Sequence, residues 1–243
     1  MGMKRLFGTV LPPLVACGLF ALLWHGGASA YRDSRWNDSY SKGQRLYASH
    51  CAACHGKNGE GSIGLPLNLQ SFLSVAPGGY IRRSIYYGRL PRQMIAYNTL
   101  LKKEEIEAIA TYVRSWQVED YKGIDARRIS GSVESGKQFY DGICSGCHGA
   151  GGVGGPQVGG GHVTNAIAGY LGPALNNQGF LKSATDGYIK ATLMHGRVGT
   201  PMGSYLKGRQ GFVELIEKEI DDIVAYIRSW EKADAGSRDP WRD

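Results

Sequence analysis

Two cysteine motifs are the residues of this sequence whose types and spacing could do chemistry. In each motif two cysteines are separated by two residues, and a histidine directly follows the second cysteine. Thiols and imidazoles at such spacings occur in disulfides, redox dithiols, zinc sites and covalent cofactor attachment. A disulfide inside either motif would close a short loop and add little stability, and a redox dithiol needs no adjacent histidine. The two motifs are Cys51, Cys54 and His55, and Cys144, Cys147 and His148.

The motifs lie in a segment of the chain that is present twice. The offset between equivalent residues is 93 at the motifs, 108 in the middle of each copy and 114 near its end. The second copy therefore has 15 extra residues after its motif and six more before its last helix. The recurring residues include Gly43 and Tyr47 (Gly136 and Tyr140), Gly88 and Arg89 (Gly196 and Arg197), and Tyr112 and Trp116 (Tyr226 and Trp230).

The duplication favours covalent haem at each motif, because Cys-x-x-Cys-His is the attachment sequence of c-type haem. Two cysteines three positions apart lie on one side of a helical turn, where they can form thioethers with the two porphyrin vinyl groups. The histidine then reaches the iron from the same side. A zinc shared by both pairs would leave the repeated histidines unexplained. We therefore expect two haem c groups, bound covalently through Cys51, Cys54, Cys144 and Cys147, with His55 and His148 as iron ligands.

The elements that must position these motifs are predicted to be helices. Near the end of each copy, apolar residues recur at the spacing of one helical face. No segment alternates apolar and polar residues for long enough to indicate a sheet, so the predicted fold class is all-α. The two apolar faces consist of Ile106, Ile109, Ala110 and Val113 in the first copy, and of Ile216, Ile220, Ile223, Val224, Ile227 and Trp230 in the second.

The length of 243 residues fits two small domains. Of the 36 glycines, many lie in a stretch at 149–161 that includes a G-x-G-x-x-G pattern. That pattern binds dinucleotides only between a strand and a helix, so we expect a flexible loop there. The predicted division is a signal peptide or anchor at 1–30, domains at 40–118 and 133–232, a linker at 119–132, and a polar C-terminal tail at 233–243.

These residues resemble class I cytochrome c, twice over, from about residue 40 to residue 232. Gly43 with Tyr47 is similar to that family's N-terminal helix, and Tyr112 with Trp116 is similar to the aromatic C-terminal helix that crosses it. The second copy repeats both features. The resemblance implies two tandem all-α domains in which a glycine lets the two helices approach closely at their crossing.

The resemblance also implies a methionine as the second iron ligand of each haem. Met94 and Met202 lie at equivalent positions, six residues after the glycine of each Gly-Arg pair. Pro201-Met202 matches the family's Pro-Met pattern, whereas the first copy reads Pro91-Arg-Gln-Met94. Met194 competes in the second copy, but its counterpart in the first is Tyr86, which cannot play the same part.

Three further histidines, His50, His162 and His195, are not expected to bind iron. In the family a proline carbonyl often orients the ligating histidine through its ring N–H, as outer-shell partners of metal ligands do. Gly172-Pro173 fits this pattern, and Pro66 is one position late and is a weaker match.

The N-terminus indicates export. Lys4 and Arg5 precede an apolar stretch at 6–24, which is just long enough to span a bilayer. This pattern fits a cleavable signal peptide ending near Ala30, a retained anchor, or a lipoprotein site at Cys17. All three place the rest of the chain on the periplasmic side of a bacterial inner membrane, either anchored or as a soluble periplasmic protein.

The net charge of +7 is unevenly distributed. Residues 31–122 hold 13 basic and 8 acidic side chains, whereas residues 123–243 hold 13 of each. Nucleic acid is not expected as a partner of an exported haem protein. A basic cluster before Met94 is either a solvated loop or a docking face for an acidic redox partner. The cluster consists of Arg82, Arg83, Arg89 and Arg92.

These features predict an electron-transfer protein that passes single electrons through two haems with histidine and methionine ligands. With an anchor it would resemble the dihaem cytochrome subunits of respiratory complexes, and without one it would be a periplasmic shuttle. The alternative is a dihaem enzyme, a peroxidase or a sulfur-compound dehydrogenase, with one open haem. Two matched methionines argue against that enzyme.

Overall fold

The computed structural model describes residues 35–154, 172–209, 211, 213–233 and 240–241. The predicted signal or anchor at 1–30, with its apolar stretch at 6–24 and Cys17, lies outside these residues, as do His162 and positions 155–161 of the glycine-rich stretch. Among the described residues, no helix is both long and apolar enough to cross a membrane.

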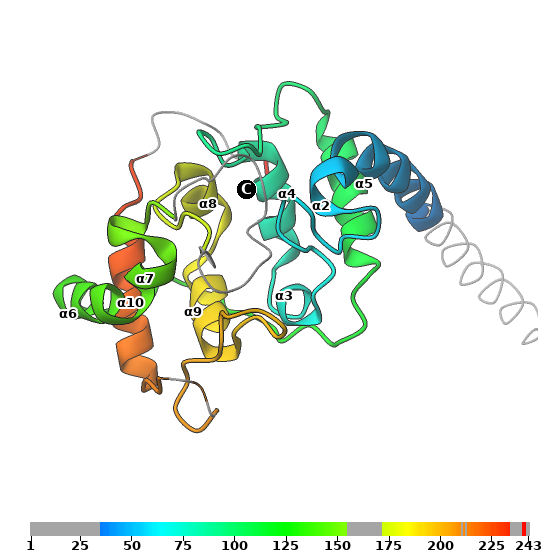
Figure 1. Cartoon of the computed structure of the whole chain (residues 1–243). Helices are drawn as coiled ribbons and strands as arrows, with labels where there is room; N and C mark the ends of the chain where they lie inside the picture. The colour runs from blue at the N-terminus through cyan, green and yellow to red at the C-terminus, as the bar shows by residue number, and fades with distance from the viewer. Residues whose placement is uncertain (1–34, 155–171, 210, 212, 234–239, 242–243) are drawn as a thin grey trace, which may run out of the picture.

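The first domain contains five helical segments (Figure 1). Residues 35–50 are helical and lead directly to Cys51 and the short helix that carries the rest of the motif. The next two helices form the side of the domain that faces the second domain. The labelled helices are α2 (Ala52–His55), α3 (Gln70–Leu73), α4 (Gly78–Tyr87) and α5 (Lys103–Arg114).

The second domain repeats this order at the predicted offsets. Its first helix, α6 (Val133–Phe139), continues into a π-helical turn η1 (Tyr140–Cys144) and then into α7 (Ser145–His148). A 3-10 turn, η2 (Ala150–Gly152), begins the glycine-rich stretch. The remaining helices are α8 (Gln178–Ser183), α9 (Asp186–His195) and α10 (Glu217–Arg228).

The structure confirms the all-α prediction. Outside the helices, the described residues contain one isolated parallel bridge between Leu206 and Leu215. This bridge lies where the second copy has its six extra residues before the last helix. The extension therefore closes on itself, and α10 keeps the position that α5 has in the first domain.

A glycine allows the two long helices of each domain to cross, as the resemblance implied. A Cβ atom added to Gly43 would clash with the carbonyl oxygen of Ala108 in α5, and one added to Gly136 would clash with that of Asp222 in α10. Aromatic rings pack beside each crossing. Their centroids are 5.1 to 5.4 Å apart for Tyr47, Tyr112 and Trp116, and 4.8 to 5.5 Å apart for Tyr140, Tyr226 and Trp230.

The predicted apolar faces form the cores, with one correction. Ile106, Ile109, Ala110 and Val113 are buried in one cluster, and Ile220, Ile223, Val224 and Ile227 are buried in another. Ile216, however, is 51% exposed. It precedes α10, and its backbone N–H donates to the Glu219 carboxylate at 2.8 Å. The predicted stripe was therefore one residue too long, because a capping position does not turn its side chain toward the core.

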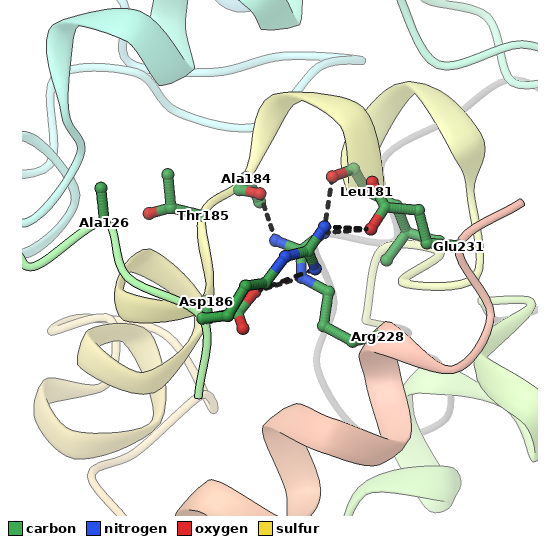
Figure 2. A pocket seen from close by; sticks show the side chains of 8 residues that line it. Ala126, Leu181, Ala184, Thr185, Asp186, Arg228 and Glu231 are labelled. Carbon is green, nitrogen blue, oxygen red and sulfur yellow. Dashed lines mark hydrogen bonds and ion pairs between the residues drawn. The ribbon is translucent and has the colours of Figure 1, made fainter. Parts of the chain in front are cut away.

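The second domain contains a buried ion pair where the first domain has a glycine. Arg228 Nε lies 2.6 Å from the carboxylate of Asp186, and neither side chain is more than 9% exposed. Figure 2 shows Arg228 reaching from α10 toward Asp186 and the carbonyls of Leu181 and Ala184. At the position equivalent to Asp186 the first domain has Gly78. The pair joins α10 to the start of α9.

The end of the chain returns to the first domain. Trp241, within the predicted polar tail, packs edge to face against Tyr86 of α4 with ring centroids 5.5 Å apart. Its indole N–H donates to Glu107 of α5 at 2.9 Å. The tail therefore contributes an aromatic contact to a domain that ends more than one hundred residues earlier in the sequence.

Candidate functional site

The first cysteine motif occupies a single helical turn. The N–H of His55 donates to the carbonyl of Cys51 at 2.9 Å, and the N–H of Gly64 donates to that of Cys54 at 2.7 Å. Cys51 is half-buried and Cys54 is exposed, and neither forms a disulfide. Burial raises the pKa of Cys51 to about 12, with a further contribution from Cys54. A redox dithiol needs a lowered thiol pKa, so this environment does not fit one.

The second motif has the same environment in a separate core. Cys144 is buried among residues of the second domain, whereas Cys51 packs against the first core. Burial raises the pKa of Cys144 to about 12 as well, and Cys147 adds to the shift. Across the described residues, no group of three or more histidine, cysteine or acidic side chains is arranged to hold a metal ion.

Both motif histidines are oriented by a backbone carbonyl. His148 Nδ1 lies 2.8 Å from the carbonyl oxygen of Pro173, which confirms the contact expected at that proline. His55 Nδ1 lies 2.8 Å from the carbonyl oxygen of Leu65, not Pro66. Leu65 is the residue 108 positions before Pro173. The interaction uses only a backbone oxygen, so leucine can replace proline, and the predicted role of Pro66 was wrong by one residue.

A glycine lies against each imidazole and leaves no room for a side chain. A Cβ atom added to Gly64 would be 2.7 Å from His55 Nδ1, and one added to Gly172 would be 2.5 Å from His148 Nδ1. Burial lowers the pKa of His148, and the bond to Pro173 opposes this shift only in part. The neutral imidazole that results, with Nδ1 bonded to a carbonyl, can coordinate iron through Nε2.

The predicted methionines lie in two loops that are closed by the same backbone hydrogen bond. The N–H of Arg89 donates to the carbonyl of Met94 at 2.7 Å, and the N–H of Arg197 donates to that of Met202 at 2.6 Å. Both methionines are half-buried. The competitor Met194 is the next-to-last residue of α9 and so lies outside this loop, although both Met194 and Met202 pack against the second core.

Sequence reasoning missed a pair of tyrosines near the cysteines. Burial raises the pKa of Tyr97, and Cys51 and Cys54 raise it further. Burial and the two cysteines of the second motif do the same to Tyr205. Each tyrosine lies three residues after the predicted methionine of its domain. Their shared offset of 108 was a signal that could have revealed them.

The other described histidines have different surroundings. His50 is exposed and stacks edge to face with Tyr97 at 5.9 Å between ring centroids. His195 ends α9, and its pKa is lowered by burial and by nearby Arg209, Lys122 and Arg197.

The residues of each domain fit a covalently bound haem. Two thiols outside any disulfide precede a histidine whose Nδ1 is bonded to a carbonyl, and a closed loop carries a methionine. A glycine beside the imidazole keeps the carbonyl close to the ring. The donor set of thiol, imidazole and thioether is the one that haem c uses.

Comparison with known proteins agrees with this geometry. Residues 38–113 match the family described as cytochrome c oxidase, cbb3-type, subunit III, and residues 133–231 match the family described as cytochrome c. The chain therefore contains two cytochrome c domains and is a dihaem c-type cytochrome with two haem c groups.

The relatives include subunits of cbb3-type cytochrome c oxidases. The subunit FixP of Bradyrhizobium diazoefficiens is 29% identical over 170 residues, which are 65% of this chain and 52% of the relative. The subunit CcoP of Rubrivivax gelatinosus is 31% identical over 129 residues, which are 51% of this chain and 39% of the relative. This chain thus spans about half the length of the curated relatives that it matches, from 39% to 60%.

A solved structure also aligns with most of the chain. It belongs to the Kuenenia stuttgartiensis reducing HAO-like protein complex. The alignment covers 79% of this chain and 96% of the chain in that structure. The identity is 20% and the TM-score is 0.49.

Proposed function

We propose that this protein carries single electrons through two haems on the periplasmic side of the membrane, as a subunit or partner of a respiratory complex. The observation that carries the proposal is the repeated site. In both domains a carbonyl orients the motif histidine at 2.8 Å, and an arginine N–H closes the methionine loop. Because the two sites have the same geometry, we infer that both haems transfer electrons. A dihaem enzyme would instead need one catalytic haem that differs from the other.

Each domain supplies two cysteines that attach the haem covalently, and one histidine and one methionine that bind its iron. Cys51, Cys54, Cys144 and Cys147 attach the haems, while His55 with Met94 and His148 with Met202 bind the two irons. Each haem iron would supply the chemistry by cycling between Fe(II) and Fe(III). The histidine and methionine of each domain would hold the iron and exclude other ligands, and methionine would raise the reduction potential relative to a second histidine.

The proposed partner is a respiratory oxidase at the membrane. Both relatives named above are subunits of cbb3-type cytochrome c oxidases. Such a setting agrees with export of the chain, which the N-terminal sequence predicts. Anchoring through residues 6–24, cleavage near Ala30 and lipidation at Cys17 remain alternatives within this proposal.

The proposed docking face for an acidic partner comprises Arg82, Arg83, Arg89 and Arg92, and Arg82 also lies against the ring of Trp241. Arg89 is engaged between the domains, where it bonds to Ser84 and approaches Ser183 of the second domain. Arg92 bonds to the carbonyl of Val153, also in the second domain. Reversing the charges of Arg82 and Arg83 should slow electron exchange and weaken its salt dependence. Unchanged rates and salt dependence would exclude this docking face.

The proposed function is tested with the full chain, purified from gently solubilised membranes. We expect it to copurify with a terminal oxidase and to exchange electrons with it. Both ferric haems should show the methionine-to-iron charge-transfer band, and neither reduced haem should bind carbon monoxide. Carbon monoxide binding at one haem of the folded protein would instead support the dihaem enzyme with an open site.

A further inference from the structure

The two domains meet at an interface with approximate twofold symmetry. Tyr80 of α4 and Tyr188 of α9 occupy equivalent positions, and their rings stack with centroids 4.0 Å apart. Helix α4 also packs against α8 of the other domain (Figure 1). Val75 and Ala76 of the first domain are fully buried in the same cluster as the second core. The interface is therefore a packed extension of a core.

The loop of Met94 is held from the second domain. Its closing residue is Arg89, whose N–H donates to the Met94 carbonyl. The carbonyl of Arg89 in turn accepts from Asn177 Nδ2 at 3.1 Å, and the carbonyl of Leu90 accepts from the same amide group at 3.0 Å. Asn177 is only 5% exposed and belongs to the second domain. One buried amide thus fixes the beginning of the loop that carries the first methionine.

The loop of Met202 is held from the first domain in the same way. Arg197, whose N–H donates to the Met202 carbonyl, bonds through Nη1 to the carbonyl of Ser71 at 3.0 Å. The next residue, Val198, donates its N–H to the hydroxyl of Ser71 at 3.0 Å. Ser71 lies in α3 of the first domain. Each methionine loop is therefore bonded to the other domain.

The two cross-domain contacts use side chains that the duplication does not share. The counterpart of Asn177 in the first domain is Leu69, and the counterpart of Ser71 in the second is Gly179. Gly179 instead allows the Gly88 carbonyl to come so close that a Cβ atom there would clash with it. Ser71→Ala removes only the bond from the Val198 N–H, because Arg197 bonds to the backbone carbonyl of Ser71. Asn177→Leu removes the bonds to the carbonyls of Arg89 and Leu90, together with the cap that Asn177 Oδ1 gives to the Phe180 N–H of α8.

We propose that each domain positions the methionine loop of the other, with Asn177 acting on the first haem and Ser71 acting on the second. The inference rests on the proposed ligation of iron by Met94 and Met202. The two domains are then not independent carriers, because the axial ligation of each haem depends on the docking of its neighbour. Asn177 and Ser71 are positioning residues, since neither belongs to a predicted ligand set.

The test uses the full holoprotein and observes each bound methionine separately. In ferrous haem the ring current moves the methyl proton signal of a bound methionine far upfield, and the variants Met94→Ala and Met202→Ala assign the two signals. We expect Asn177→Leu, which introduces the side chain of the first-domain counterpart, to shift or broaden the Met94 signal alone. Ser71→Ala should shift or broaden the Met202 signal alone.

This crossed pattern separates positioning from general destabilisation. Ser115→Ala serves as the matched control, because the hydroxyl of Ser115 bonds to the carbonyl of Tyr112 at 2.6 Å within its own domain. It should leave both signals in place. Two wild-type signals that neither Asn177→Leu nor Ser71→Ala changes would overturn the inference alone, as would changes at both haems in both variants. Absence of a methionine signal in the wild type would overturn the proposed ligation and this inference together.

Discussion

The imidazole of His148 has a carbonyl and a glycine, from the consecutive residues Pro173 and Gly172, close to its Nδ1 atom. The Pro173 carbonyl fixes Nδ1, and the missing side chain of Gly172 allows the loop to approach the ring. A hydrogen bond from the second ring nitrogen raises the basicity of a metal-bound histidine. The loop that contains Gly172 and Pro173 therefore controls how strongly His148 would donate electrons to its iron.

We expect Gly172→Ala to raise the reduction potential of the second haem. The added Cβ would lie 2.5 Å from Nδ1, so the ring or the loop must move and the bond to Pro173 weakens. A less basic imidazole stabilises Fe(III) less. A tenfold change in the preference for Fe(III) over Fe(II) corresponds to about 59 mV, and we expect a rise on that order in a potentiometric titration.

Gly146→Ala is the control for this change. It lies between the two cysteines of the same motif, has open space around its Cβ position, and aligns with Ala53 of the first motif. Its potentials should match the wild type. Equal shifts in the two variants would show that the contact between Gly172 and the ring has no special effect.

At the scale of helices, the crossing of α6 and α10 determines the shape of the second domain. Gly136 brings the two backbones so close that no side chain fits between them. Insertion of a methyl group into such a contact typically costs about 1 to 3 kcal/mol and can cost more when backbone must move. Because the obstacle at Gly136 is a backbone carbonyl, the crossing itself would have to open.

Gly136→Ala should therefore lower the free energy of unfolding by about 3 kcal/mol. Chemical denaturation of the holoprotein, followed by circular dichroism, measures this change. Gly142→Ala is the matched control, because Gly142 lies further along the same helical run, in η1, and nothing is within 4 Å of its Cβ position. A loss of similar size in the control would contradict the packing argument.

The buried ion pair of Asp186 and Arg228 is a second contact that joins helices of this domain, in addition to the crossing at Gly136. The carboxylate also accepts the N–H of Ile129 at 2.8 Å, so it ties the linker to α9 as well. Removal of one partner of a buried ion pair leaves an uncompensated charge and typically costs about 3 to 5 kcal/mol. In the first domain, Arg114 bonds to the carbonyls of Leu73 and Ala76 without an acidic partner at Gly78.

Asp186→Asn should destabilise the second domain by about 3 kcal/mol or slightly less, since the amide keeps one acceptor for Arg228. Hydrogen exchange should show reduced protection in α9 and α10, with α4 and α5 little affected. Asp141→Asn is the control, because Asp141 forms an exposed ion pair with Lys137 that contributes little. Equal effects of the two substitutions would contradict the role of burial.

Local features of the helices could be predicted from the sequence, whereas contacts between distant segments could not. Apolar spacing predicted the buried face of α5, and the glycine of each copy predicted the close crossing. The exposure of Ile216 was missed because periodicity does not reveal where a helix begins. The carbonyl of Leu65 was missed because a backbone acceptor has no sequence signature. The cross-domain bonds of Asn177 depend on docking, which neither copy encodes by itself.

At the scale of the whole molecule, the two domains are held together by non-covalent contacts as well as by the linker. The domains share the stacked pair of Tyr80 and Tyr188, and the C-terminal tail returns to α4 and α5 through Trp241. The guanidinium of Arg82 lies 6.0 Å from the centroid of the Trp241 ring, within reach of a cation–π interaction. Trp241 of the C-terminal tail consequently stabilises the first domain.

Trp241→Ala should destabilise the first domain more than the second, although the residue follows the second domain in sequence. The substitution removes the aromatic contact with Tyr86 and the hydrogen bond to Glu107. An aromatic pair contributes about 0.5 to 1.5 kcal/mol beyond its buried area, so a total loss of about 1 to 2 kcal/mol follows for this half-buried ring. Hydrogen exchange in α4 and α5 measures the loss, with α9 and α10 as the internal reference. Trp241→Phe keeps the ring but not the indole N–H, so its effect should be smaller. Unchanged protection of α4 and α5 in Trp241→Ala would show that the tail does not stabilise the first domain.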